Sequence, residues 1–397
     1  MPPNKTARKI AIIFLLFTAI FTFFRTSMAG IFSLFYSNNG IPNADISSIK
    51  SFQNIGIMVG LLPSGYLSDK FGRLKVLSLS SWVIAISFLS LILFRTFLSF
   101  SLAELLYGIG LALNSGTLLA YITDLQEKNK IEPNSKLMGM QVIVLNIMTL
   151  LGGNVGTGLF SLNETAPIWL AMIGLMLYPI FVISLVKKMS FSDNKADTHS
   201  KISLKMRLKN FFAFFIKKKF WILLLLNIGY NCGTQFILVY WSIIYVEKLH
   251  FNLSLVYTLF MCALILGSVV FNKLVTSLST KWLTIFNTLT MIALFVCSGI
   301  WTNRYILLIL FLLIEVFMGI MSGQISATSN EAIYGENNKS MMLSTVSFTS
   351  EILVSISMFI SSWIMKLAGD LNVMFFVSAA YFAILLLIVP LLKEKKC

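Results

Sequence analysis

The sequence predicts an all-α integral membrane protein with twelve transmembrane helices, built as two six-helix pseudo-repeats. Three observations support this prediction: the composition, a series of long apolar runs, and a motif that occurs once in each half. Of 397 residues, 57% are hydrophobic and 12% are charged, and the mean hydropathy is +0.84. Soluble domains carry about 25% charged residues, which excludes a water-soluble fold. The apolar runs reach the roughly 20 residues that cross a bilayer as a helix, and without sustained alternation they do not favour a β-barrel.

The apolar runs give the positions of the spans. In the first half they lie near 10–36, 46–67, 75–94, 99–122, 138–160 and 167–186, and in the second near 220–246, 254–276, 282–301, 305–328, 341–365 and 373–392. The predicted organisation is therefore an N-terminal six-helix bundle (1–186), a cytoplasmic linker (187–219) and a C-terminal six-helix bundle (220–397). Within the linker, ISLKMRLKNFFAFFIKKK (202–219) places apolar residues on one helical face, which predicts an amphipathic helix on the inner leaflet. The alternative is an unstructured basic tether.

The basic residues give the orientation. The net charge of +15 is compatible with nucleic-acid binding, but the charges lie mainly in short loops. The N-terminus, alternate loops, the central segment and the C-terminus hold 25 of the 31 Lys and Arg residues. The opposite loops hold four, and Arg25 and Lys50 lie within spans. Because basic loops stay in the cytoplasm, we expect both termini to be cytoplasmic, in a plasma (inner) membrane, and no nucleic-acid partner.

A motif repeats between the halves. ELLYGIGLALNSG (104–116) and EVFMGIMSGQIS (315–326) share a Glu, three residues, a Gly and an Ile, at an offset of 211. GLLPSGYLSDK (60–70) has a weaker partner in GSVVFNKLVTS (267–277), at an offset of 207. Two matches at nearly equal offsets predict a duplication. Repeated membrane halves with a site between them at the midplane are typical of secondary transporters.

A charged stretch stands between the second and third predicted spans, GYLSDKFGRLKV (65–76). It resembles the signature of the major facilitator superfamily, which reads Gly, any residue, Leu, Ala or Ser, Asp, Arg or Lys, any residue, Gly, Arg, and Arg or Lys. Leu74 departs from this pattern, because a basic residue is common there. Together with the span count and the central basic segment, the resemblance covers nearly the whole chain. It implies the fold of that superfamily and transport by alternating access.

The resemblance also implies a conformational latch, formed by Gly65, Asp69, Gly72, Arg73 and Asp124. Asp69 would accept hydrogen bonds at the start of span eleven, near 339–341, where the helix dipole favours an anion. Arg73 would pair with Asp124, and Gly65 would allow close approach of a helix. The alternative is a solvated charged turn in which each ion pair contributes well under about 1 kcal/mol.

Placing a charged residue inside a membrane span costs a free energy of about 2.5–3.5 kcal/mol or more. Such residues include Arg25, Glu104, Glu315 and Glu351. The resemblance places spans one, four, seven and ten around a central cavity, which puts the first three of these residues towards it. Arg25 and Glu104 lie at similar heights and form a candidate pair, with a purely structural ion pair as the alternative. Burial favours the protonated form of a carboxyl group, so Glu104, Glu315 and Glu351 are proton-coupling candidates. The alternative is that they are solvated cavity acids.

Span seven carries a polar stripe, because Asn227, Asn231 and Gln235 are four residues apart and share one helical face. The stripe is expected either to face substrate or to make hydrogen bonds between helices. The substrate-cavity candidates are therefore Arg25, Glu104, Asn227, Asn231, Gln235 and Glu315. In the fourth span, Glu104 stands where many drug and sugar transporters of the superfamily have Arg, which puts the usual role of that position in doubt.

The direction of transport has only a weak signal. LGGNVGTGL (151–159) resembles a Gly-x-x-x-Gly-Pro motif of exporters, with Thr157 in place of Pro; helix packing by small residues explains it equally well. The leading prediction is proton-coupled efflux (H⁺ antiport) of a small amphipathic or drug-like compound. The alternatives are a proton-coupled uptake symporter and, remotely, a non-transporting sensor.

The sequence lacks the motifs of the rival classes: paired-His metal spacing, a Walker-type loop and a nucleophile elbow. We expect no enzyme activity, no metal and no cofactor, with the proton gradient as driving force. The expected partners are a small-molecule substrate, protons and membrane lipids, and the expected oligomeric state is a monomer.

Overall fold

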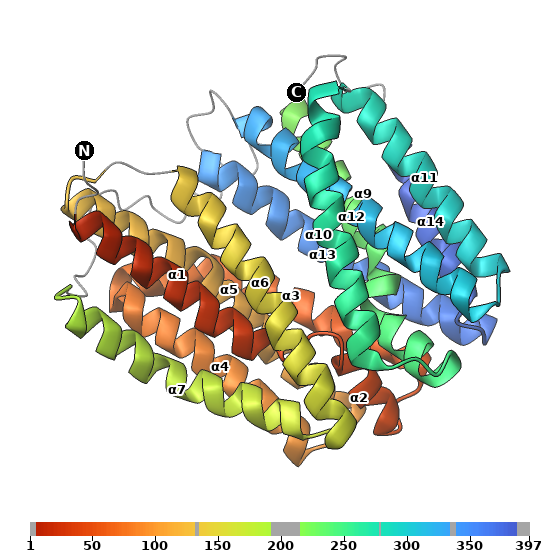
Figure 1. Cartoon of the computed structure of the whole chain (residues 1–397), viewed down its shortest axis with the longest axis horizontal. Helices are drawn as coiled ribbons and strands as arrows, with labels where there is room; N and C mark the ends of the chain where they lie inside the picture. Colours follow the sequence, from red (N-terminus) through yellow and green to blue (C-terminus); the bar gives the residue numbers. More distant parts are fainter. Residues whose placement is uncertain (1–4, 132–134, 192–214, 278, 334–338, 387–397) are drawn as a thin grey trace. The chain divides into compact units, whose positions relative to one another are not determined.

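The computed structural model describes residues 5–131, 135–191, 215–277, 279–333 and 339–386, and its elements are helices (Figure 1). The first half contains α1 (Lys5–Thr26), α2 (Phe32–Asn38), α3 (Asn43–Phe71), α4 (Arg73–Leu93), α5 (Phe97–Lys128), α6 (Ser135–Leu162) and α7 (Ala166–Lys188). The second half contains α9 (Lys218–Ile243), the π-helix η1 (Ile244–Lys248), α10 (Leu253–Ser277), α11 (Thr280–Ile300), α12 (Arg304–Ile333), α13 (Lys339–Ala368) and α14 (Val373–Leu385).

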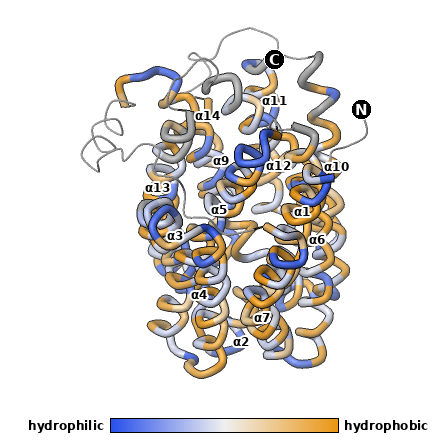
Figure 2. The backbone as a smooth tube through the Cα atoms, turned by 90° about the vertical axis from the view of Figure 1, so that its left-hand side faces the viewer, coloured by the Kyte–Doolittle hydropathy of each residue, from blue (hydrophilic) through white to orange (hydrophobic). Residues whose placement is uncertain are grey.

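Most of these helices have the length and composition of membrane spans. Ten of those described are long and apolar enough to cross a bilayer: α1, α4, α5, α6, α7, α9 together with η1, α10, α11, α12 and α13. Hydrophobic residues run along the helices in Figure 2, whereas hydrophilic residues gather mainly near their ends. Helix α3 is long but rich in polar residues, and α14 is a shorter apolar helix. The all-helical membrane fold predicted from the sequence is therefore confirmed.

The chain forms two compact units. The first contains Met1–Ile41 and Ile49–Ser200, and the second contains Pro42–Ser48 and Lys201–Cys397. The predicted amphipathic helix (202–219) lies outside the described residues except for residues 215–219.

The first predicted span is interrupted. Helix α1 ends at Thr26, and α2 begins only at Phe32. Between them Gly30 has φ of +81°, a left-handed conformation that glycine adopts without steric cost. The Ser27 hydroxyl donates to the carbonyl of Phe24 at 2.8 Å. A span expected as one helix over 10–36 is thus a long helix and a seven-residue helix joined by a turn.

The same pairs of helices pack in each unit. In the first unit α1 contacts α6 and α7, and α4 contacts α5 and α7; in the second unit α9 contacts α13 and α14, and α11 contacts α12 and α14. These pairs correspond in chain order. The internal duplication therefore exists in three dimensions as well as in the sequence.

Glycines fix the closest helix contacts in both units. A Cβ on Gly108 of α5 would overlap the carbonyl oxygen of Gln53 in α3, and a Cβ on Gly319 of α12 would overlap that of Leu264 in α10. The second pair follows the first by 211 residues at both positions. Gly56 and Gly267 repeat this relation, each against a carbonyl of the partner helix. The predicted offset of 211 thus holds in the structure. The second sequence match, at an offset of 207, was misaligned by one helical turn, because Gly267 corresponds to Gly56 and not to Gly60.

The first turn of α3 belongs to the second unit. The Tyr240 hydroxyl donates to the Asn43 carbonyl at 2.7 Å and accepts from the Ser47 N–H at 3.2 Å. Asp45 pairs with Lys366 near the end of α13 at 2.5 Å. Tyr240 therefore satisfies one of the amides that a helix leaves unpaired at its start.

Candidate functional site

A buried ion pair lies inside the first unit. The side chain of Glu104 on α5 is 1% exposed, and its Oε1 lies 2.7 Å from Nζ of Lys50 on α3. The same oxygen accepts a hydrogen bond of 2.6 Å from the Tyr36 hydroxyl of α2. Lys50 also donates to Oε1 of Gln53 at 2.9 Å. We call Tyr36, Lys50, Gln53 and Glu104 the Glu104 cluster.

The glycine contact described above explains why Lys50 meets Glu104. Gly108 follows Glu104 by about one helical turn, and Gln53 follows Lys50 by about one turn. Because Gly108 lets α5 touch the α3 backbone at Gln53, the next turn brings the Lys50 ammonium onto the Glu104 carboxylate. The close approach of two backbones thus builds the ion pair.

The predicted pair of Arg25 with Glu104 is not formed. Nη1 of Arg25 instead donates to the Tyr107 hydroxyl at 3.2 Å, and the Glu104 carboxylate is paired with Lys50. The prediction compared the heights of Arg25 and Glu104 along two spans, and it did not consider Lys50 on a third span. Arg25 and Glu104 remain close in the fold, since Tyr107 lies one turn from Glu104 on α5.

Aromatic rings enclose the Glu104 cluster. Phe100 packs on Tyr36 with ring centroids 4.7 Å apart, and Phe32 lies 5.5 Å from Tyr107. The Lys50 ammonium sits 4.3 Å from the centroid of Phe32, over its face, an arrangement that stabilises a cation. Within this enclosure Oε2 of Glu104 is buried and has no hydrogen-bond partner among the described residues. A buried carboxylate oxygen without a donor is costly, so this oxygen marks a position where a hydrogen-bond donor would be stabilised.

Four residues of this site were not among those singled out from the sequence: Tyr36, Lys50, Gln53 and Tyr107. Lys50 carried a usable signal, because it is a lysine inside a predicted span and a charge there requires a partner. The two tyrosines carried none, since an aromatic residue within an apolar run does not reveal the direction of its hydroxyl group.

Glu315 is the counterpart of Glu104 in the second unit. It is 7% exposed on α12, and no hydrogen bond or ion pair joins it to another described residue. Glu351 on α13 is half-buried and likewise makes no such contact within the described ranges. Of the three candidate proton carriers, only Glu104 is therefore held by a cation.

The polar stripe of span seven makes contacts with helices. Asn231 donates to Oγ of Ser350 and Gln235 to the carbonyl of Val354, both on α13 and both at 3.5 Å. Asn227 donates to the carbonyl of Leu223 in its own helix at 2.8 Å. In this structure Asn231 and Gln235 make hydrogen bonds between helices. This is one of the two roles expected for the stripe, the other being contact with substrate.

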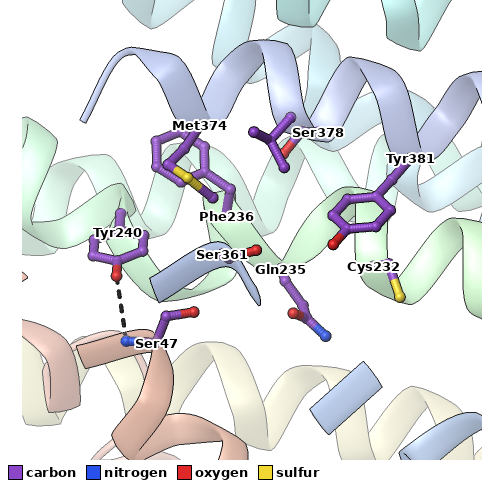
Figure 3. Close-up of a pocket in the computed structure, with 10 residues that line it drawn as sticks. Ser47, Cys232, Gln235, Phe236, Tyr240, Ser361, Met374, Ser378 and Tyr381 are labelled. Carbon is purple, nitrogen blue, oxygen red and sulfur yellow. Dashed lines mark hydrogen bonds between the residues drawn. The ribbon is translucent and has the colours of Figure 1, made fainter. Parts of the chain in front are cut away.

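Gln235 also lines a small cavity, with Cys232 and Tyr240 on α9 and Tyr381 on α14 (Figure 3). Its volume of about 10 Å³ is close to what one water molecule requires. A solute does not fit there without a change in the packing of α9 against α14.

The charged stretch that includes the end of α3 and the start of α4 forms an ion-pair network. Nη1 of Arg73 lies 2.8 Å from Asp69, and its Nε lies 3.1 Å from Asp124 at the end of α5. Gly72 has φ of +101°, so the turn between α3 and α4 requires a glycine. The carboxylates are 49% and 40% exposed, and water weakens both pairs. The residues near 339–341, expected to meet Asp69, have no described side chains.

The close approach of a helix expected at Gly65 does not occur in the first unit. A Cβ at this position would have no atom within 4 Å, so no described residue uses Gly65 for a close approach. The glycines of α3 that do so are Gly56 and Gly60, which both approach α5.

The segment that resembles an exporter motif packs α6 against α1. A Cβ on Gly152 would overlap the Phe23 carbonyl oxygen, and one on Gly156 would overlap that of Ser27. Thr157, in place of Pro, donates to the carbonyl of Gly153 at 2.9 Å. Both glycines are thus explained by helix packing.

Comparisons with known proteins agree with this architecture. The family model of the Major Facilitator Superfamily matches residues 14–333. No curated protein sequence matches the chain. The nucleoside transporter NupG is similar in structure, with a TM-score of 0.75 at 12% identity over 96% of this chain and 98% of that chain. A bacterial homologue of the human lysosomal transporter Spinster, in an inward-facing and unoccupied conformation, gives a TM-score of 0.66 at 13% identity, over 98% and 96% of the two chains.

Proposed function

Because the chain belongs to the major facilitator superfamily, and is therefore a transporter and not an enzyme, we propose that it moves a small polar solute across the membrane by proton-coupled symport. The observation that carries the choice of solute is the Glu104 cluster, with its buried carboxylate oxygen that lacks a donor. The driving force in this proposal is the proton gradient, and the chain uses no cofactor.

The chemistry of the cluster supports a polar cargo. Lys50 offers a cation, Glu104 an acceptor, and Tyr107 and Gln53 further polar groups within one aromatic enclosure. An apolar compound would desolvate these groups without replacing their hydrogen bonds, which is costly. A solute with hydroxyl or amino groups would replace them, and would donate to Oε2 of Glu104. Stacking on the surrounding rings would add to its binding.

Glu315 is the proposed proton carrier. It is buried and has no cation or hydrogen-bond donor among the described residues, so its neutral form is compatible with its surroundings. Taking up a proton on one side and releasing it on the other requires a carboxyl group that is not neutralised by a fixed cation. Glu104 does not meet this requirement, because Lys50 is paired with it. Glu351 remains the second candidate.

Efflux by proton antiport is the second candidate function. It is favoured by the LGGNVGTGL segment, whose Gly152 and Gly156 occupy the positions of the exporter motif. Their contact with the α1 backbone explains these glycines by packing alone, so we rank efflux of an amphipathic compound below symport of a polar one.

Transport by purified protein in liposomes tests the proposal. Compounds are first identified by a growth or uptake screen that compares cells lacking the protein with cells overproducing it. Under an imposed pH gradient, acidic outside, symport predicts accumulation of a polar compound; antiport predicts loss of preloaded compound.

The variants then assign the roles. Glu315→Gln should abolish accumulation driven by the pH gradient while exchange of labelled for unlabelled solute continues. Glu104→Gln should abolish both. If Glu315→Gln accumulates solute with the same pH dependence as the wild type, Glu315 is not the carrier, and Glu351→Gln is measured next. If only apolar cations are transported, the polar-solute proposal fails.

A further inference from the structure

The first unit has a polar cavity far from the Glu104 cluster. It has a volume of about 260 Å³ and lies where the start of α1 meets the ends of α5 and α7. Lys9 on α1 and Lys128 on α5 line it. Lys128 follows Glu104 by 24 residues on one helix, which corresponds to about 36 Å along its axis. The proposed transport role therefore does not account for this cavity.

The surroundings of the cavity are strongly cationic. The described residues at these three helix ends include seven basic side chains: Lys5, Arg8, Lys9, Lys128, Lys130, Lys187 and Lys188. Only two acidic residues lie in the same stretches, Asp124 and Glu127, and Asp124 is paired with Arg73. Such an excess of cations attracts an anion, and the hydroxyl groups of Thr6 and Ser190 add possible donors at the wall.

The ends of α5 and α7 are closed in a way that suits an anion. A helix C-terminus normally presents unpaired carbonyl groups, which repel negative charge. Here the amide of Ile131 donates to the Gln126 carbonyl at 2.9 Å, and that of Phe191 donates to the Val186 carbonyl at 3.1 Å. Lys130 and Ser190 adopt the positive φ that this closure requires, +51° and +63°. One carbonyl in the last turn of each helix is thereby paired.

Part of the wall is apolar. Leu125 is buried, and Met189 and Phe191 are half-buried beside it. A free phosphate ion gains nothing from such a surface. A phospholipid does, because the glycerol and the first acyl carbons follow its phosphate. The distribution of basic residues further predicts that this end of the bundle is cytoplasmic, where the leaflet contains anionic lipids.

We propose that this cavity binds the phosphate group of an anionic phospholipid of the inner leaflet, held by Lys9 and Lys128 with the lipid backbone against Leu125 and Phe191. A competing explanation is that the lysines only neutralise the helix ends: Nζ of Lys9 lies 3.4 Å from the Met189 carbonyl, and basic residues stabilise helix C-termini without any ligand.

Lipid titration of the full-length protein, followed by native mass spectrometry, separates these explanations. Delipidated protein in detergent is titrated with phosphatidylglycerol and with phosphatidylcholine. Wild type should bind phosphatidylglycerol about thirtyfold more tightly, since each of the two lysines near an anionic headgroup contributes about 1 kcal/mol. The double variant Lys9→Gln/Lys128→Gln should lose that preference. Lys187→Gln/Lys188→Gln removes the same charge from the same end of the unit, outside the cavity wall, and should retain it.

Several outcomes overturn the proposal. One is equal affinity of the wild type for the two lipids, and another is an equal loss in both double variants, which would indicate a diffuse electrostatic effect. Displacement of phosphatidylglycerol by excess inorganic phosphate would show that the cavity takes the free anion and not a lipid. If the cavity double variant does not purify in a folded state, Lys9→Gln and Lys128→Gln are measured singly, and a loss of less than about threefold in each overturns the proposal as well.

Discussion

Glu104 and Glu315 occupy equivalent positions in the two units, but their surroundings differ. Each glutamate precedes by one turn the glycine that touches the neighbouring helix, Gly108 in the first unit and Gly319 in the second. The first unit places Lys50 opposite its glutamate. The equivalent position in α10, 211 residues later, is Met261. The backbone contact is present in both units, whereas the cation is present in the first unit only, at this pair of positions.

This difference separates two tasks that a single carboxylate does not combine well. A carboxylate paired with a fixed cation offers a stable hydrogen-bonding surface. A carboxyl group without a cation can change its protonation state as the protein changes shape. Two equivalent helix pairs thus present a carboxylate that is paired with a cation and, in our proposal, a proton carrier.

The largest expected effect comes from making the first unit resemble the second. Lys50→Met leaves the Glu104 carboxylate buried without its cation, which should lower the free energy of unfolding by about 3–5 kcal/mol. The double variant Lys50→Met/Glu104→Gln should recover most of that loss, because no charge then remains. Thermal unfolding in detergent measures both. Lys366→Met, which breaks a more exposed pair, serves as control and should cost under about 1 kcal/mol. A double variant as unstable as the sum of its single variants would show that the two residues are not coupled.

The backbone contact itself should be equally sensitive in the two units. Gly108→Ala and Gly319→Ala each introduce a methyl group against a carbonyl of the neighbouring helix, with an expected loss of about 1–3 kcal/mol. Gly116→Ala, on the same helix as Gly108 but with no atom within 4 Å of its Cβ, is the matched control and should unfold like the wild type. Unequal losses at Gly108 and Gly319 would show that the duplicated contact is not equivalent in packing.

The converse exchange adds a cation to the second unit. Met261→Lys should place an ammonium group one turn from the α10–α12 contact and hold Glu315 in its charged form. Accumulation driven by a pH gradient should then fall at least about tenfold, equivalent to about 1.4 kcal/mol, while solute exchange in liposomes continues. Met261→Gln controls for polarity without charge. Unchanged accumulation in Met261→Lys would argue against Glu315 as carrier.

The smallest effect on stability is expected at the charged stretch that includes the end of α3 and the start of α4. Asp69→Asn removes one half-exposed ion pair of Arg73 and should change the unfolding free energy by under about 1 kcal/mol. If the network acts as a conformational latch, the initial transport rate should nevertheless fall several-fold at normal expression. A rate equal to that of the wild type would show that the network is only a solvated charged turn and not a conformational latch.

The sequence predicted the fold well because hydrophobic length decides it. The apolar runs and the Glu-x-x-x-Gly repeat both depend on local composition, which can be read without knowledge of contacts. The interruption of the first span was missed, since 27–31 contains no strong helix breaker other than Gly30. The register of the second repeat was off by one turn for a similar reason: glycine is common in apolar helices, and only the contact identifies which glycine corresponds.

The site was predicted less well because it depends on which residues meet between helices. Glu104 was found from its cost in a membrane, and the Arg73–Asp124 pair from a motif. The cation bound to Glu104 could not be chosen from heights along spans alone, as Lys50 and Arg25 are both long and basic. The direction of the stripe on α9 was likewise open, because Asn231 and Gln235 have the same chemistry towards a solute as towards α13.

The Lys50–Glu104 pair also constrains how the protein is made. The two residues are 54 positions apart, so α3 leaves the ribosome and reaches the insertion machinery before Glu104 has been synthesised. Until α5 arrives, the Lys50 ammonium has partners only in earlier residues such as Gln53 and Phe32 and lacks its counter-charge, and an unpaired charge in a membrane costs about 2.5–3.5 kcal/mol. We therefore expect α3 to become stable in the bilayer when α5 packs against it, so that these two helices integrate together.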